Sequence, residues 1–278
     1  MLILKRPWTR QPQVAVGVDW SNPITQGLVF AFDGQESDAV HRRVVDITNT
    51  AGRGVGAKGK HRTFDGSNQL SFNPRNPPTG YATMVCLAYC TNNTATNTLV
   101  AMPKIGVTNE YTMLDISGTE TNDPVRVLTQ KAGTFGIAYL TQPSGEYLNR
   151  WVLFGGASVS GSDNRIYIDG VRKTPTSTFG SSGLDVGQVD RFDVGVINLL
   201  TPTNPLYGNV ALAAIWDRLL TDAEHAALFV NPWQLFAPQQ IIIPTPAAAG
   251  YTHPTLSLAT ATEITATGFK PRVTYTFA

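Results

Sequence analysis

Residues 208–230 read GNVALAAIWDRLLTDAEHAALFV, a stretch in which a strand pattern passes directly into a helix pattern. Residues 208–216 are nearly all apolar and predict a β-strand that ends at Asp217 and Arg218. Residues 221–230 predict a single short helix. The rest of the chain shows strand patterns, so the sequence predicts an all-β domain with one short helix.

Local signals at both ends specify this helix. Thr221 is a capping residue, and Glu224 three positions later completes a capping box. Asp222 and Glu224 also place negative charge at the positive end of the helix dipole. Asn231 precedes Pro232, which pushes Asn231 out of helical geometry and ends the helix.

Short strands fill the sequence before this stretch. Residues 151–154 form an apolar strand, and residues 165–168 alternate before Asp169-Gly170, which suits a type I′ hairpin turn. Further strands are expected at residues 27–33, 69–72, 82–90, 98–102, 111–116, 125–129, 134–139 and 191–196. Many short strands separated by turn residues predict a β-sandwich.

Composition limits the partners. The chain has 278 residues, of which 42% are hydrophobic and 15% are charged, and its net charge is +1. A charge this small gives no field that favours nucleic acid or a membrane surface, so neither partner is expected. No apolar stretch approaches the roughly 20 residues of a membrane span. The first residues also lack a signal-peptide pattern, so we expect synthesis in a cytoplasm.

Residues 1–18 are interpreted as an extended N-terminal arm. They carry three basic residues and no acid, and Pro7 and Pro12 exclude a helix. We expect the arm to dock on a partner. The sandwich is placed at residues 19–236.

Residues 41–62 have no clear period and are rich in glycine and basic residues. They lack the interleaved aromatic residues of a nucleic-acid stacking platform. We therefore interpret this segment as a solvated loop.

Residues 237–250 are a proline- and alanine-rich linker interrupted by three isoleucines, Ile241 to Ile243, which we expect to dock on the sandwich or on another subunit. Residues 251–278 predict a C-terminal β-hairpin extension. Val273, Tyr275 and Phe277 alternate with polar residues and give the hairpin one apolar face. A lone hairpin is marginal in water, so it requires a partner surface, in cis or from a neighbouring chain.

The two cysteines, Cys86 and Cys90, fall in one predicted strand. Residues four apart on a strand are roughly 13 Å apart. A disulfide requires Cα atoms within about 7 Å. Both cysteines are therefore expected to be free, buried thiols.

Residues 27–236 resemble laminin-G-like domains. The segments that carry the resemblance are Phe64-Asp65-Gly66, Trp151 with its following strand, Tyr167-Ile168-Asp169-Gly170, and residues 215–224 (IWDRLLTDAE). The resemblance implies a concanavalin-type jelly-roll β-sandwich with one short helix. Proteins with this fold usually bind ligands or serve as structural components, and only some of them are enzymes.

Other segments are similar to a group of tailed-bacteriophage and prophage proteins encoded among virion structural genes. These segments are residues 6–13 (RPWTRQPQ), 19–23 (DWSNP), 231–236 (NPWQLF) and 271–277 (PRVTYTF). The similarity implies a virion component, exposed on the head or the tail and made in the cytoplasm of a host bacterium. Its expected partners are other virion proteins and copies of itself. The residues expected to make assembly contacts are Arg6, Trp8, Arg10, Ile242, Val273, Tyr275 and Phe277.

Catalysis is not expected. A retaining glycosidase needs two carboxyl groups about 5–5.5 Å apart. Glu120 lies near Asp123, but in a polar turn, and the cluster of Asp185, Asp190 and Asp193 contains no glutamate.

A serine triad is not indicated either, because no Gly-x-Ser-x-Gly elbow precedes a helix. The four histidines are expected at the surface: His41, His61, His225 and His253.

No cofactor is expected, with calcium as the alternative left open. Asp115, Asp163 with Asn164, and Asp190 offer the hard oxygen ligands that calcium prefers. The sequence contains no twelve-residue calcium loop.

A host surface glycan is the alternative partner, in which case the protein is a glycan-binding adhesin or receptor-binding module of the phage tail. Lectin sites of this fold use rim loops with aromatic and amide side chains. The residues nominated are Tyr81, Tyr111, Tyr207, Asn92 and Asn93, with Asn97 and Asn109 as further amides. Trp151 is left out because its position in such domains is usually core.

Overall fold

The computed structural model describes residues 2–6, 9–12, 16–34, 37–40, 43–44, 51–73, 78, 82–92, 94–120, 122–132, 134–141, 143, 145–159, 163–180, 189–237 and 239–243. The chain divides into two compact units. One is Pro7–Pro238, and the other combines Met1–Arg6 with Gln239–Ala278. The predicted hairpin at residues 251–278, with Val273, Tyr275 and Phe277, lies outside the described residues, as do Trp8, Tyr81, Asn93, His41, His253 and Asp185.

The larger sheet of the Pro7–Pro238 unit has ten strands among the described residues. Its main path runs β15-β14-β13-β8-β20-β2-β3-β4, while β6 pairs with β20 and β5 with β6. The strands are β2 (Leu28–Phe32), β3 (Ser37–Asp38), β4 (Arg43–Val44), β5 (Gly52–Gly56), β6 (Gly59–Asp65), β8 (Ala82–Cys90), β13 (Trp151–Ser158), β14 (Arg165–Ile168), β15 (Val171–Lys173) and β20 (Tyr207–Trp216).

The smaller sheet has seven described strands in the order β16-β12-β11-β10-β9-β17-β7. They are β7 (Leu70–Phe72), β9 (Thr96–Pro103), β10 (Tyr111–Ser117), β11 (Val125–Lys131), β12 (Thr134–Leu140), β16 (Ser177–Gly180) and β17 (Phe192–Val194). A separate short ladder joins β18 (Ile197–Asn198) to β19 (Pro202–Thr203).

The two sheets pack face to face around an aromatic core. Phe30 of the ten-stranded sheet contacts two rings of the other sheet, with centroids 4.7 Å away at Phe72 and 5.5 Å away at Phe192. Leu114 and Phe154, one from each sheet, are fully buried in the same cluster. The predicted all-β jelly-roll sandwich with one short helix is confirmed for the described residues.

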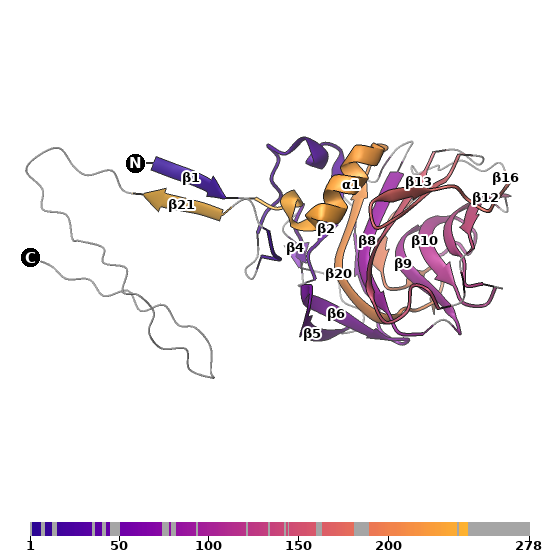
Figure 1. The fold of residues 1–278 in the computed structure, drawn as a ribbon. Helices are drawn as coiled ribbons and strands as arrows, with labels where there is room; N and C mark the ends of the chain where they lie inside the picture. The colour runs from indigo at the N-terminus through magenta and orange to yellow at the C-terminus, as the bar shows by residue number, and fades with distance from the viewer. Residues whose placement is uncertain are drawn as a thin grey trace, which may run out of the picture. The chain divides into compact units, whose positions relative to one another are not determined.

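A second apolar layer covers the outer face of the ten-stranded sheet. Helix α1 (Asp222–Val230) and the 3-10 helices η1 (Pro23–Thr25) and η3 (Pro232–Leu235) lie over this face (Figure 1). Strand β20 supplies Leu212 and Trp216 to this layer and Ile215 to the core between the sheets. The strand is therefore apolar throughout because both of its faces are buried.

The capping box predicted for α1 is confirmed. The Thr221 hydroxyl accepts a hydrogen bond from the Glu224 backbone N–H at 3.2 Å, and the Thr221 backbone N–H donates to Glu224 Oε2 at 2.8 Å. Arg218 forms an ion pair with Glu224 at 2.6 Å. The helix ends at Val230, with Asn231 as its C-terminal cap.

The strand assignments from the sequence hold within a few residues, and those at Ala82–Cys90 and Arg165–Ile168 coincide with β8 and β14. Cys86 and Cys90 both lie on β8, buried in the core between the sheets, and both are free thiols as predicted.

The interpretation of residues 41–62 as a solvated loop was wrong over its second part. Strands β5 and β6 form an antiparallel hairpin, and β6 pairs with β20. Arg62 is buried and its guanidinium donates to the Ala51 carbonyl at 3.0 Å. The partner of β6, strand β20, lies about 150 residues away in the sequence, so no local pattern indicates this pairing.

The smaller unit contains one described ladder, between β1 (Leu2–Arg6) and β21 (Gln239–Ile243). Its register pairs Leu2 with Ile243, Ile3 with Ile242 and Leu4 with Ile241. The backbone of the isoleucine segment thus pairs with the N-terminal segment, a partner that the sequence did not indicate. The predicted domain boundaries stay a prediction.

Candidate functional site

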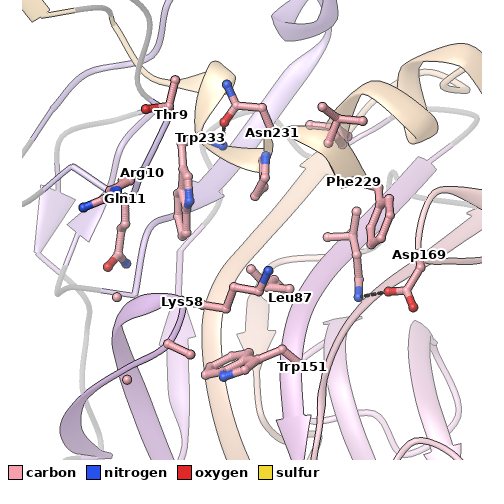
Figure 2. Close-up of a pocket in the computed structure, with 17 residues that line it drawn as sticks. Thr9, Arg10, Gln11, Lys58, Leu87, Trp151, Asp169, Phe229, Asn231 and Trp233 are labelled. Atoms are coloured by element: carbon pink, nitrogen blue, oxygen red, sulfur yellow. Dashed lines mark hydrogen bonds between the residues drawn. The ribbon is translucent and has the colours of Figure 1, made fainter.

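A cavity of about 530 Å³ opens on the outer face of the ten-stranded sheet. Its floor is made by Leu87, Trp151 and Leu153 from the neighbouring strands β8 and β13. One wall is the end of α1 with the start of η3, and the opposite wall is the turn between β5 and β6 with residues 9–11. Figure 2 shows Trp151, Lys58 and Trp233 bordering this space. The volume lies in the range of small-molecule sites.

Trp151 is the main aromatic surface of the floor. Its indole is half-buried, and its orientation is set by two rings, His61 at 5.6 Å and Tyr89 at 5.7 Å between centroids. Interplanar angles of 62° and 59° leave these neighbours tilted against the indole. Trp151 is partly exposed rather than a fully buried core residue, because it begins β13 on the outer face and packs at the border of the second apolar layer.

Asp169 supplies a carboxylate to the cavity from the turn between β14 and β15. Both turn residues have positive φ, 50° for Asp169 and 77° for Gly170, as predicted for this hairpin. Asp169 accepts a hydrogen bond from the Leu153 backbone N–H at 3.0 Å (Figure 2) and one from Arg150 at 3.2 Å. A Cβ on Gly170 would come within 2.7 Å of the Phe229 Cβ, so glycine permits the close approach of the turn to α1.

Lys58 lies at the turn of the β5–β6 hairpin, on the opposite wall, and is exposed. The hairpin is held by Gln11, whose buried side-chain amide donates to the Lys60 carbonyl at 2.7 Å and also to the Asp33 carbonyl. The Lys60 backbone N–H donates back to the same Gln11 side chain. A residue of the N-terminal arm region therefore fixes the loop that carries Lys58.

Helix α1 and η3 complete the cavity with Phe229, Asn231 and Trp233. Phe229 is 51% exposed, whereas Trp233 is buried and stacks on Phe236 at 6.3 Å. Asn231 caps η3 by accepting a hydrogen bond from the Trp233 backbone N–H at 3.2 Å. Exposed apolar surface at Phe229 and Trp151 thus alternates with polar groups around the cavity.

This arrangement is suited to binding. Asp169 is the one carboxylate among the described residues that line the cavity, and it already has two hydrogen-bond donors. A general acid and base, or a nucleophile with its base, requires a second titratable partner within hydrogen-bond reach.

The described residues nominated for glycan contact, Tyr111, Tyr207 and Asn92, do not line this cavity. Tyr207 and Asn92 meet through Asn97, whose side chain accepts from the Tyr207 backbone N–H at 2.9 Å and donates to the Asn92 carbonyl at 2.8 Å. Tyr111 pairs with Pro103 at one end of the β9–β10 ladder. Asn97 lies near the other end, where Thr96 pairs with Ser117. Their contact with glycan stays a prediction, and the cavity beside Trp151 was missed because its lining comes from distant segments.

A second polar cluster lies on β10 and β11. Arg126 forms hydrogen bonds with Asp115 at 2.9 and 2.5 Å and an ion pair with Glu120. Burial raises the pKa of the fully buried Asp115 carboxyl, and the positive charge of Arg126 opposes that shift. Both carboxylates are engaged by one guanidinium, so the cluster is a structural ion network.

The expected surface positions of the histidines were wrong for the two that the structure describes. His225 on α1 is 1% exposed and stacks on Tyr167. His61 on β6 is also buried, against Trp151. Both are neighbours of apolar or aromatic side chains from other strands, which their own sequence surroundings do not reveal.

The candidate calcium ligands do not converge. Asp163 binds Arg165 at 2.9 Å, Asp190 accepts from the Ile105 backbone N–H at 2.8 Å, and Asp115 is held by Arg126. Within the described ranges no group of three or more His, Cys, Asp or Glu side chains comes together as a metal site. No helix of the described chain has the length and apolarity to cross a membrane.

The described residues nominated for assembly, Arg6, Arg10 and Ile242, belong to different units. Arg6 and Ile242 lie on the paired strands β1 and β21, and Arg10 is exposed at the cavity of the sandwich. Their role in assembly stays a prediction.

No protein-family model matches the chain, and no curated protein matches it in sequence. Solved structures do match it in fold. Domain 4 of AbnA, a GH43 extracellular arabinanase from Geobacillus stearothermophilus solved with arabinotriose, is 17% identical with a TM-score of 0.55, over 72% of this chain and 97% of that one.

Toxin domains are also among the similar structures. The receptor binding domain of botulinum neurotoxin C/D mosaic serotype has 11% identity and a TM-score of 0.54, over 74% of this chain and 51% of that one. The binding domain of Paraclostridial Mosquitocidal Protein 1 has 11% identity and a TM-score of 0.54, over 74% and 52%. The chain therefore spans about half the length of these toxin domains. At such low identity the likeness establishes the lectin-like β-sandwich fold alone.

Proposed function

We propose that the sandwich is a non-enzymatic module that binds a glycan in the cavity beside Trp151. The observation that carries the proposal is the half-buried indole on the floor of a cavity of about 530 Å³. A sugar ring offers C–H groups that pack on an aromatic face and hydroxyls that bond to charged or amide groups. Lys58 and Asp169 both line the cavity, and Figure 2 draws them on either side of it.

Fold-level analogy supports this proposal. The arabinanase domain with a similar fold was solved with arabinotriose bound, and the similar toxin domains are receptor-binding domains. Proteins of this fold recur as binding modules, although fold by itself assigns no ligand.

The test is binding of the full chain to an array of bacterial surface glycans, followed by titration with the best ligand. Trp151→Ala should weaken binding about tenfold or more, since it removes the aromatic floor. Trp20→Ala is the matched control, because Trp20 is 59% exposed and lies outside the cavity. The proposal fails if no glycan binds, or if the two variants lose affinity equally.

The non-enzymatic assignment has its own test. Asp169 and the Arg126-bound carboxylates are each engaged in hydrogen bonds or ion pairs within the fold. Purified protein should release no reducing sugar from the glycan that it binds. Release that one Asp or Glu substitution abolishes would overturn this part of the proposal.

A second role, as a structural component of a tailed-phage virion exposed on the head or tail, is favoured by the β1–β21 ladder and by the sequence segments named above. Three successive rungs of this two-stranded sheet pair apolar residues. With the two strands that the described residues supply, such a sheet is marginal by itself, and strand edges of this kind favour the addition of a strand from a neighbouring chain.

Deletion of residues 2–6 tests the virion role through the ladder, and deletion of residues 251–278 tests the predicted hairpin. Each truncated protein should enter virions at reduced occupancy and form a smaller oligomer in light scattering. Trp151→Ala, which alters the cavity alone, should assemble normally. Full occupancy of both truncated proteins would exclude the terminal segments as the anchor.

A further inference from the structure

The cavity beside Trp151 has an uneven charge distribution. Its lining includes two cationic residues, Lys58 and Arg10, and one carboxylate, Asp169. Arg150 lies 3.2 Å from Asp169 and balances its charge. Neither Lys58 nor Arg10 forms an ion pair within the described part of the chain. The space is therefore left with positive charge that no described protein group neutralises.

Lys58 is held where that charge faces the aromatic floor. Figure 2 shows Lys58 and Trp151 bordering the same cavity. The turn is fixed by Gln11, and Gly59 beside Lys58 has φ of 96°, with a Cβ there falling 2.3 Å from Gln11 Oε1. The fixed turn sets the position of the backbone from which the Lys58 side chain extends at the edge of the cavity.

Asp169 is unsuited to bind a second cation in this space. One of its oxygens accepts from the Leu153 backbone N–H and the other from Arg150. The carboxylate is thus committed to holding the β14–β15 turn against β13. A ligand meets a neutralised acid on one side of the floor and an unneutralised ammonium group on the other.

We infer that this cavity selects an acidic sugar of the uronic acid type, with its ring on Trp151 and its carboxylate bound by Lys58. This inference rests on the proposed glycan-binding function and names the ligand class of the same site. A carboxylate bound by an ammonium group forms a charge-assisted hydrogen bond, which is stronger than a bond between neutral groups. A neutral sugar offers Lys58 only hydroxyl groups, which form weaker hydrogen bonds with an ammonium group than a carboxylate does.

The experiment measures calorimetric binding of trigalacturonate and of galactotriose, which differ by a carboxylate on each ring, to the full-length protein. Trigalacturonate should bind about tenfold more tightly, and this preference should weaken as salt is raised. Lys58→Gln should abolish the preference by lowering the affinity for trigalacturonate to about that for galactotriose. Lys131→Gln is the matched control, because Lys131 ends β11 in the other sheet.

The outcomes separate the two proposals. If neither oligosaccharide binds and the glycan array is also empty, the glycan-binding function fails. If both bind equally, or if Lys58→Gln keeps the preference for trigalacturonate, binding stands and the acidic selectivity is wrong. A sulfated galactose oligosaccharide forms a further arm: binding tighter than trigalacturonate would assign the site to sulfate and overturn the uronic acid assignment.

Discussion

The phenol ring of Tyr167 lies flat on the imidazole of His225, with centroids 3.6 Å apart and an interplanar angle of 12°. Tyr167 also donates a hydrogen bond to Asp222 at 2.9 Å, so β14 is joined to the first turn of α1. The stack places an ionisable histidine at the base of the helix, where water has almost no access.

This burial makes the stability of the protein depend on pH. Burial lowers the pKa of His225 to about 4, although the nearby charges of Asp222 and Glu224 oppose the shift. The unfolded chain takes up a proton near pH 6.5, before the folded protein does. The stability from neutral His225 is therefore complete above pH 6.5 and is lost as the pH falls through 4.

We expect wild-type protein to lose about 3 kcal/mol more than His225→Gln between pH 7 and pH 4, since each pKa unit is worth about 1.4 kcal/mol. Urea unfolding at both pH values measures the two free energies. Contributions from other groups cancel in the comparison. Equal losses in the two proteins would show that His225 titrates normally in the fold.

Asp193 should make the folded protein less stable as the pH rises, which is the opposite of the effect of His225. Burial raises its pKa to about 7 despite hydrogen bonds from the Ser71 hydroxyl at 2.6 Å and the Asn198 backbone N–H at 2.8 Å. The folded protein keeps this proton after the unfolded chain has lost it near pH 4. The associated stability is complete below pH 4 and is lost as the pH rises through 7, on the order of 4 kcal/mol. Asp193→Asn should flatten this decline in urea unfolding, and a decline of the same size in the variant would contradict the assignment.

Removing Arg126 should be costly because Asp115 is fully buried beside it. Arg126→Gln leaves that carboxylate without its cation, and we expect a loss of about 3 kcal/mol in the free energy of unfolding. Lys104→Gln is the comparison. Its ion pair with Glu110 at 2.9 Å is partly exposed, so its loss should stay below about 1 kcal/mol. Similar losses in the two variants would show that the buried network contributes little.

The cap of α1 should contribute about 1 kcal/mol. Thr221→Ala removes the hydroxyl that accepts from the Glu224 backbone N–H, which leaves a helix-end donor unpaired. Thr108→Ala serves as the control, because Thr108 is exposed in the turn after β9. The denaturant midpoint at constant slope is the measurement. An unchanged midpoint for Thr221→Ala would mean that the cap does not hold the helix.

Both thiols should resist alkylation until the protein unfolds. Burial raises the pKa of Cys90 to about 12 and that of Cys86 well above its usual value, and the thiolate is the reactive form. Iodoacetamide should add nothing to the native protein and two groups to the unfolded one, as read by mass spectrometry without reductant. A mass lower by two hydrogens would indicate a disulfide and contradict the placement of both residues on β8.

Signals carried by neighbouring residues were sufficient for much of the fold. The cap at Thr221, the stop at Pro232 and the turn at Asp169-Gly170 each depend on residues within four positions, and all appear in the structure. The two buried faces of β20 likewise leave an apolar run that marks a strand by composition alone. These features were predictable for two reasons. A cap or a turn depends on residues close in sequence, and a strand buried on both faces is apolar at nearly every position.

Tertiary structure decided the cavity. Trp151 lines the cavity together with residues of α1 and of the β5–β6 turn, and that turn is positioned because β6 pairs with β20, a contact between distant residues. His225 is buried for the same reason, since Tyr167 reaches it from another strand. The sequence determined the sandwich and its helix through local patterns, whereas the site arose from long-range pairings that no local pattern encodes.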